Sequence, residues 1–265
     1  MQIAIVGAGI AGLGASWLLD RHHRVTLYEA NPRLGGHSHT VTTRFGAREV
    51  PVDTGFIVYN ERNYPNLVRL FDALDVPTEP SNMSFGVSQD EGAFEYASTR
   101  WSALFAQRRR LLSPRHWALL ADIPRFNRAA AAFLAGSAPD RALGDWLDAH
   151  GFGDRVAPHY VLPMAAAIWS APLRQVTRFS ARSFLTFFER HGLLTVNDQP
   201  AWRTVSGGSR VYVDRLAKSL NATIRRATPV ADVRRLGGGV QVTDAMGQSA
   251  RFDAVILASH ADQSL

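Results

Sequence analysis

The sequence contains no cysteine among its 265 residues. Disulfide bonds, cysteine-ligated metal ions, a thiol nucleophile and attachment of a cofactor through sulfur are therefore excluded. No apolar run reaches the roughly eighteen residues that a transmembrane helix requires. The apolar stretch at 3–19 also lacks the basic start of a secretory signal peptide. We therefore expect a soluble protein in the cytoplasm.

Lysine is almost absent, since Lys218 is the only one. The formal net charge of +6 therefore rests on arginine. A basic chain can bind nucleic acid or anionic lipid, or its charge can serve solubility alone. The arginines are scattered except at 108–110 and Arg115, and no nucleic-acid recognition motif is present. We predict no nucleic-acid partner and attribute the arginine bias to a GC-rich genome.

Strand and helix patterns alternate at both ends of the chain, whereas the middle is mainly helical. This predicts an α/β fold, in which a Rossmann-like, discontinuous nucleotide-binding domain at 1–60 and 205–265 is interrupted by a mainly helical substrate domain at 61–204. Gly151 and Gly192 are expected to cap two of the helices. The expected elements of the middle part are a hairpin at 83–97 and helices at 101–111, 115–135, 143–150, 154–165 and 180–191.

The most informative segment is a glycine-rich turn near the start. Gly7, Gly9 and Gly12 follow an apolar run at 3–6 and precede a predicted helix at 10–20. This spacing is typical of a dinucleotide site, because the glycines permit a tight turn, close approach of a pyrophosphate and close packing of helix on strand. The start of the helix attracts the phosphates. Glu29 closes the next apolar run and can bond a ribose.

A second glycine-containing step follows at Arg33, Leu34, Gly35 and Gly36. A nicotinamide site does not need this step, so it favours a larger dinucleotide, FAD. Glu29 also disfavours NADP, because its carboxylate would repel a 2′-phosphate.

Together these segments resemble the flavin-containing amine oxidase superfamily, which includes amine oxidases, protoporphyrinogen oxidase and carotenoid desaturases. Residues 53–60 and 202–208 resemble a bacterial branch described only as NAD/FAD-binding proteins, often found beside lipid-modifying enzymes. The likeness extends from residue 1 to residue 265, but only the first forty residues match a sharp motif.

The resemblance implies FAD bound in an extended form. Residues 7–12 would hold the pyrophosphate, Glu29 the adenosine ribose, and 33–37 the pyrophosphate and ribityl chain. Residues 54–56 would approach the flavin ring, while Val230 would bond adenine and Ala258 would lie near the adenosine half. The implied cofactor-binding residues are Gly7, Gly9, Ile10, Ala11, Gly12, Glu29, Ala30, Arg33, Gly35, Gly36, His37, Thr54, Gly55, Phe56, Val230 and Ala258.

The sequence departs from the family pattern twice. Position 37 holds His where amine oxidases usually have Arg, which weakens the case for amine oxidation. The family also ends with a Gly-Asp motif and a helix facing the flavin, and nothing after Ala258 supplies them. We therefore expect this chain to be truncated.

Other candidate residues have less specific interpretations. His37 and His39 alone make a poor metal site, so no metal is predicted. Asp53 fits a turn residue better than a base, and Tyr59 with Asn60 could line a pocket or begin the next helix.

In the helical middle, His159 and Tyr160 could face the flavin, although a satisfied core histidine is favoured. The arginines at 108–110 lie among aromatic and apolar residues, a combination that suits a membrane surface or a lipid substrate. An ordinary solvated helix face is the favoured interpretation. Peripheral contact with membrane lipid stays the alternative.

The predicted function is that of an FAD-dependent oxidoreductase, in which the flavin accepts hydride from a small substrate. The lipid association and His37 favour an apolar, isoprenoid-like or lipid substrate over an amine, and no catalytic residue is assigned. Two alternatives stay open: a non-redox flavoenzyme such as a sugar mutase, and a truncated FAD-binding module without activity.

Overall fold

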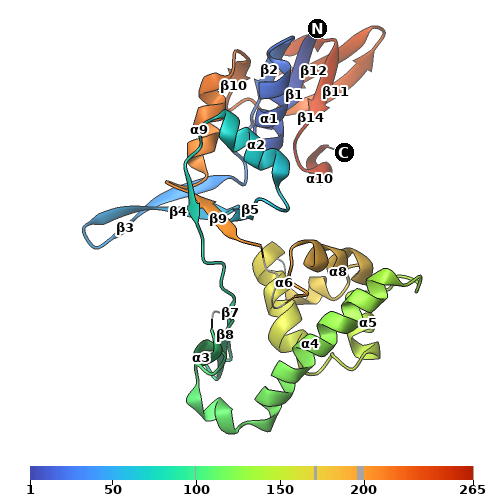
Figure 1. Cartoon of the computed structure of the whole chain (residues 1–265). Helices are drawn as coiled ribbons and strands as arrows, with labels where there is room; N and C mark the ends of the chain where they lie inside the picture. Colours follow the sequence, from blue (N-terminus) through green and yellow to red (C-terminus); the bar gives the residue numbers. More distant parts are fainter. Residues whose placement is uncertain (99, 170–171, 196–199, 265) are drawn as a thin grey trace. The chain divides into compact units, whose positions relative to one another are not determined.

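The computed structural model describes residues 1–98, 100–169, 172–195 and 200–264 (Figure 1). The chain divides into two compact units, Met1–Ser81 with Trp202–Leu265, and Asn82–Ala201. We call them the nucleotide unit and the helical unit. The nucleotide unit is larger than the sequence predicted, because residues 61–81 and 202–204 belong to it.

A parallel sheet forms the centre of the nucleotide unit. Its order is β10 (Thr223–Arg225), β2 (Arg24–Tyr28), β1 (Gln2–Val6) and β14 (Ala254–Leu257). In β1, Ile3 pairs with Val25 on one side and with Ala254 on the other. The two ends of the chain therefore meet in one sheet, and the predicted α/β fold class is confirmed.

Layers cover both faces of this sheet, because successive side chains of a strand point to opposite faces. Ile3 and Ile5 pack with residues of α1 (Ile10–Leu19), α2 (Pro65–Ala73) and α9 (Arg210–Ser219). Figure 1 shows these three helices beside the parallel sheet. Ala4 packs instead with an antiparallel sheet of β11 (Val230–Leu236), β12 (Gly239–Asp244) and β13 (Ser249–Phe252). A last short helix, α10, spans Ala261–Ser264.

Two smaller sheets complete the unit. One is the hairpin of β3 (His39–Phe45) and β4 (Arg48–Gly55), and the other has the order β5 (Tyr59–Asn60), β9 (Trp202–Val205), β6 (Thr78–Pro80). The turn predicted at 53–55 is wrong, because the pairing of Thr40 with Asp53 keeps these residues in β4. Residues 59–60 do not begin a helix either, since they pair with β9 and α2 starts at Pro65.

The helical unit begins with the predicted hairpin, β7 (Gly86–Gln89) and β8 (Phe94–Ala97). Its main core surrounds Phe126 and Trp146, both fully buried. The remaining elements are α3 (Trp101–Leu104), the 3-10 helix η1 (Arg108–Leu112), α4 (Pro114–Ala135), α5 (Leu143–Ala149), the π-helix η2 (Ala157–Val161), α6 (Leu162–Trp169), α7 (Leu173–Val176) and α8 (Ala181–Arg190).

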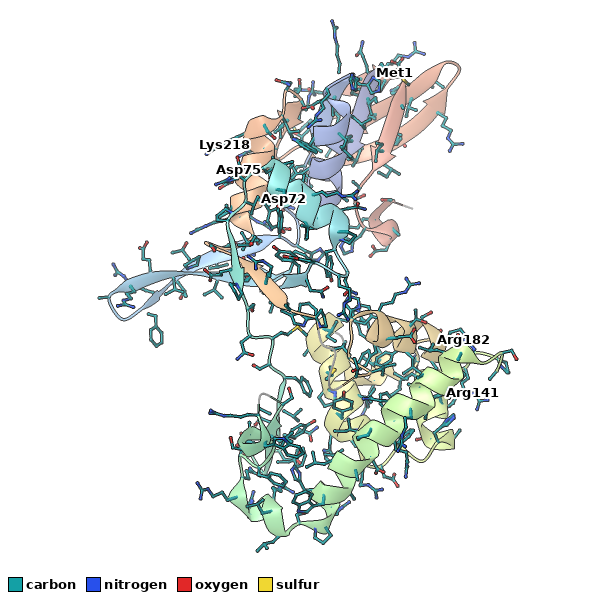
Figure 2. All side chains as sticks on the ribbon, in the orientation of Figure 1. Met1, Asp72, Asp75, Arg141, Arg182 and Lys218 are labelled. Carbon is teal, nitrogen blue, oxygen red and sulfur yellow. The ribbon has the colours of Figure 1, made fainter. Side chains whose placement is uncertain are left out.

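The helix ends in this unit are stabilised by glycines that follow the helices and by a contact from a distant side chain. Gly151 and Gly192, directly after the C-caps of α5 and α8, have φ values of +74° and +69°, which confirms the predicted caps. At the C-terminal end of α4, Arg182 donates to the carbonyl oxygens of Leu134 at 3.3 Å and Ala138 at 2.8 Å (Figure 2). Arg182 thus satisfies the carbonyl oxygen of Leu134, which the helix itself leaves unpaired, and ties down the segment that follows the helix.

Two predicted helices differ from the structure. The helix expected at 101–111 is interrupted between α3 and η1, and Arg109 and Arg110 reach back to the carbonyl oxygen of Ala93. The helix expected at 154–165 contains the π-helix η2, where Pro158 has no N–H to donate. None of the helices in the described ranges is both long and apolar enough to span a bilayer.

Candidate functional site

The turn after β1 is closed by contacts that only glycine allows. Gly7 has φ +100°, and its N–H donates to the carbonyl oxygen of Tyr28 at 2.8 Å. A Cβ on Gly7 would lie 2.8 Å from the carbonyl oxygen of Ala258, and one on Gly12 only 1.8 Å from that of Gly7. The turn, α1 and the end of β14 are therefore packed backbone against backbone.

The space in front of α1 is bounded by main chain. The helix starts at Ile10 with Gly9 as N-cap, and no side chain caps it. Its first N–H groups have no partner within the helix and carry partial positive charge. A Cβ on Gly9 would meet nothing closer than the Cα of Gly36, 4.0 Å away. Ile10 and Ala11 are exposed here. This opening fits a pyrophosphate, which needs donors and no obstructing side chain.

Glu29 is the acid beside this opening, and only 8% of its surface is exposed. Oε2 accepts the N–H of Ala8 at 2.8 Å, and Oε1 accepts the N–H of Asn31 at 2.9 Å. These bonds fix the carboxylate between the glycine turn and the end of β2, followed by the exposed Ala30. The position suits an acceptor for ribose hydroxyls.

The second glycine step lies directly against the first. The N–H of Gly35 donates to the carbonyl oxygen of Ala8 at 2.8 Å, and a Cβ on Gly36 would lie 3.0 Å from the Cα of Gly9. Arg33 folds over its own loop and donates to the carbonyl oxygen of Gly36 at 2.8 Å. The structure thus brings the turn at 7–12 and the loop at 33–36 together, and the side chain of Arg33 stabilises the loop.

The residues predicted for the flavin side follow this loop. Gly55 packs against it, since a Cβ there would lie 2.5 Å from the carbonyl oxygen of His37. The ring of His37 lies 5.1 Å from that of His260, whereas Nδ1 of His39 bonds the hydroxyl of Thr54 at 2.9 Å. No group of three potential metal ligands occurs among the described residues.

Phe56 is the one non-glycine residue of this segment with strained backbone, at φ +51°. Its ring is 38% exposed and contacts that of Tyr64 edge-on, with centroids 6.0 Å apart. Strained residues concentrate at functional sites. Phe56 therefore stays a candidate for contact with a bound ring.

Asp53 has a role that the sequence did not predict. Its Oδ1 accepts the N–H of Ser209 at 2.9 Å and the hydroxyl of Thr40 at 2.6 Å. The carboxylate therefore sits at the start of α9, where negative charge is stabilised. Gly208 leaves room for this contact, because its φ is +86° and a Cβ there would lie 2.5 Å from Cγ2 of Thr40.

A buried tyrosine ties α9 to the cofactor loop, and sequence reasoning missed it. The hydroxyl of Tyr212 donates to Oγ of Ser38 at 2.5 Å, and both residues are buried. Burial raises the pKa of Tyr212 to about 12, against the opposing effect of the Ser38 bond. The phenol therefore stays protonated and holds the loop that follows Gly36.

Two predicted residues come from the far end of the chain. The N–H of Ala258 donates to the carbonyl oxygen of Val6 at 2.8 Å, directly beside the glycine turn. Val230 lies farther along, where the preceding Thr228 donates its N–H to the carbonyl oxygen of Glu29 at 2.8 Å. The segment at 228–230 therefore borders Glu29, whereas Ala258 borders the glycine turn.

Comparisons with known proteins identify the family of the chain. The family model for flavin containing amine oxidoreductases matches residues 10–265. A carotenoid phi-ring synthase from Streptomyces griseus is 30% identical over 280 residues, covering 97% of this chain and 52% of the relative. The chain therefore spans about half the length of this relative.

Solved structures show the same fold at low identity. A putrescine oxidase bound to putrescine matches with a TM-score of 0.69 and 21% identity, covering 97% of this chain and 58% of that one. A CLA-producing fatty acid isomerase from P. acnes matches with a TM-score of 0.66 and 16% identity, covering 99% and 59%. The chain belongs to the flavin containing amine oxidoreductase family, as its motifs predicted, and FAD is the cofactor that this membership gives.

Proposed function

We propose that this chain is the FAD-binding part of an oxidoreductase, in which the bound flavin accepts hydride from a small apolar substrate. The observation that carries the proposal is the meeting of two glycine loops and a fixed carboxylate in front of α1. The residues present fit the cofactor, since the opening at Gly9 is lined by main chain and donors.

In this proposal the chain's residues bind and orient the cofactor. The N–H groups at the start of α1 hold the pyrophosphate, residues 33–37 lie along it and the ribityl chain, and Glu29 accepts from the ribose. Arg33 and Tyr212 keep the loop in shape through bonds to Gly36 and Ser38. The flavin ring would lie beside residues 54–56. The adenosine half would lie beside Val230 and Ala258.

The substrate class rests on the relative named for a carotenoid product, which favours an apolar, isoprenoid-like molecule. His37, in place of the usual Arg, also favours this over an amine. A cytoplasmic location, a substrate role for the helical unit and peripheral membrane contact belong to the same proposal.

A pair of glycine variants tests the cofactor site. In Gly9→Ala the new methyl meets only the Cα of Gly36 at 4.0 Å, so folding should persist while the pyrophosphate is obstructed. Gly14→Ala lies on the same helix with nothing within 4 Å of its Cβ. We expect Gly9→Ala to weaken FAD binding at least about tenfold, a loss of about 1.4 kcal/mol, measured by calorimetric titration of the apoprotein.

Gly14→Ala should bind FAD as the parent protein does. Equal affinity for FAD in the parent and in Gly9→Ala would contradict the assigned site. So would the absence of FAD uptake by all three proteins. The parent and both variants should first show the same circular dichroism spectrum, so that a loss of binding reports on the site.

Reaction type is tested separately on the FAD-loaded protein. Anaerobic addition of an isoprenoid substrate should bleach the oxidised flavin, and the diamine putrescine should not. If putrescine alone bleached the flavin, the substrate would be an amine and the proposed apolar substrate would be wrong.

A second candidate, a non-redox flavoenzyme, is favoured by the fold shared with a fatty acid isomerase. Such an enzyme, like a sugar mutase, would turn over only after the flavin had been reduced beforehand. Absence of both bleaching and turnover, with FAD bound, would leave a binding module without activity.

A further inference from the structure

The helical unit contains a cavity of about 230 Å³ that the FAD site does not use. A water molecule occupies about 30 Å³ of liquid, so the cavity has room for a small ligand. Four separate segments supply its wall: the β7–β8 turn, η1, the start of α4 and residues 155–159. The lining residues are Asp90, Ala93, Phe94, Arg110, Arg115, His116, Leu119, Arg155 and His159.

Positive charge in this cavity exceeds what the protein neutralises. Arg115 has no hydrogen bond or ion pair with any residue that the structure describes. Arg110 bonds only neutral acceptors, the carbonyl oxygen of Ala93 at 2.6 Å and Oε1 of Gln107 at 3.2 Å. Of the three arginines, Arg155 alone has a carboxylate partner, Asp122, which Arg125 shares.

Two histidines line the same wall. His116 is 2% exposed, and its Nδ1 has no hydrogen-bond partner in the described part of the chain, although Nε2 bonds the carbonyl oxygen of Leu104 at 2.9 Å. Buried polar atoms are normally paired. Because Nε2 donates to the carbonyl oxygen of Leu104 and burial lowers the pKa of His116, Nδ1 of the neutral ring is an unpaired acceptor, which suits a ligand that carries a hydroxyl hydrogen.

The pKa of His159 is affected by the same arginines. Burial lowers its pKa most, and the charges of Arg115 and Arg110 lower it further, against the opposing effect of Asp90. Its Nδ1 bonds Oε1 of Gln89 at 2.7 Å, which fixes the ring. An anion in the cavity would relieve the repulsion that these two arginines exert.

The backbone around the cavity carries two features that are common at functional sites. His159 lies on the π-helix η2, a rare element often found at such sites. In the β7–β8 turn, Asp90 and Glu91 have φ values of +51° and +53°, unusual for residues other than glycine. The turn is held in place by Gln107, which donates to the carbonyl oxygen of Gly92 at 2.6 Å.

We propose that this cavity binds a phosphate group, either as a small soluble phosphate or as the headgroup of a lipid. A tetrahedral hydrogen phosphate offers acceptor oxygens to several guanidinium groups at once, and its hydroxyl can donate to Nδ1 of His116. A lipid source is compatible with the exposed apolar residues of two elements that form the wall, because Leu112 of η1 is 89% exposed and Trp117 of α4 is 48% exposed. The inference concerns the helical unit and does not depend on the proposed reaction.

The test uses the full chain and calorimetric titration with inorganic phosphate. Arg115→Gln removes an exposed cation without a partner, so folding should not change. Arg128→Gln is the matched control, since it removes an exposed arginine of the same helix that does not line the cavity. We expect Arg115→Gln to weaken phosphate binding at least about tenfold, and Arg128→Gln to leave it unchanged.

A second arm compares vesicles of phosphatidylcholine with and without phosphatidic acid. Binding to phosphatidic acid vesicles alone, lost in Arg115→Gln, assigns the site to a lipid headgroup, whereas binding of inorganic phosphate assigns it to a soluble ligand. Acetate binding as tightly as phosphate would overturn the assignment, as would equal effects of the two arginine variants. So would the absence of binding in both arms.

Discussion

The nucleotide unit surrounds its ligand space with main chain, whereas the helical unit surrounds its cavity with long side chains. In front of α1, the nearest approach to a Cβ on Gly9 is the backbone of Gly36. In the helical unit, Arg110, Arg115 and His116 form the wall instead. A main-chain site is disrupted by adding atoms, and a side-chain site by removing them.

The largest effect is expected from removing a core ring of the helical unit. Phe126 is fully buried and packs edge-on against Trp146 and Phe152. Phe126→Ala should lower the free energy of unfolding by about 3–5 kcal/mol, because a cavity is left. Chemical denaturation followed by circular dichroism measures this. FAD affinity should be retained, because the nucleotide unit has a core of its own, and joint loss of both properties would contradict that separation.

Adding one methyl at Gly12 should come next. The new Cβ would lie 1.8 Å from the carbonyl oxygen of Gly7, so backbone must move. Gly12→Ala should cost about 1–3 kcal/mol through overpacking and abolish FAD binding. Denaturation and FAD titration of the same sample measure both. A variant of parental stability that still binds FAD would show that this contact is not close in solution.

Glu29 is the exception within the nucleotide unit, a side chain in a site made of main chain. Glu29→Gln keeps the shape but removes the charge that the N–H groups of Ala8 and Asn31 contact. We expect an effect of about 1.5–3 kcal/mol, the range for hydrogen bonds to charged groups, shared between stability and FAD affinity. Glu49→Gln, an exposed change in β4, is the control and should alter neither.

Alkaline pH affects both units, because burial raises the pKa of Tyr212 in one and of Tyr160 in the other to about 12, and raises the pKa of Tyr96 in the helical unit further. Between pH 10 and 12 the unfolded chain has lost these protons while the folded chain keeps them. Stability is therefore fully present below pH 10 and falls as pH rises through 12. Tyr212→Phe and Tyr160→Phe should each reduce this fall in denaturation at high pH, and an unchanged profile would contradict the assignment.

The smallest effect is expected at Gly14, where nothing lies within 4 Å of an added Cβ. Gly14→Ala should raise stability by up to about 1 kcal/mol, the difference in helix propensity. A decrease in melting temperature would mean that this face of α1 is covered.

The contrast also explains what the sequence could predict. Gly7, Gly9 and Gly12 lie close together in the chain and have a fixed spacing, so their site could be recognised from a motif. The interruption at 105–107 could not, because it depends on a distant contact, that of Arg110 with the carbonyl oxygen of Ala93. The cationic cavity had no motif at all, because four segments provide its residues.

Some side chains had roles that local patterns could not reveal. Asp53 was expected in a turn, yet it reaches the start of a helix 156 residues later in the chain. Tyr212 and Ser38 are separated by 174 positions, and neither looks unusual in the sequence. Short motifs predict the main-chain framework of the site, whereas tertiary packing decides which side chains support it.

The pairing of β1 with both β2 and β14 has a consequence for biosynthesis. β1 is made first, but its partner at Ala254 emerges only after the whole inserted segment has been translated. At about 5–20 residues per second, that delay is roughly 10–50 s. The inserted helical segment is therefore complete on the ribosome before the parallel sheet can close, and until then the open edge of β1 is a surface that chaperones can shield from aggregation.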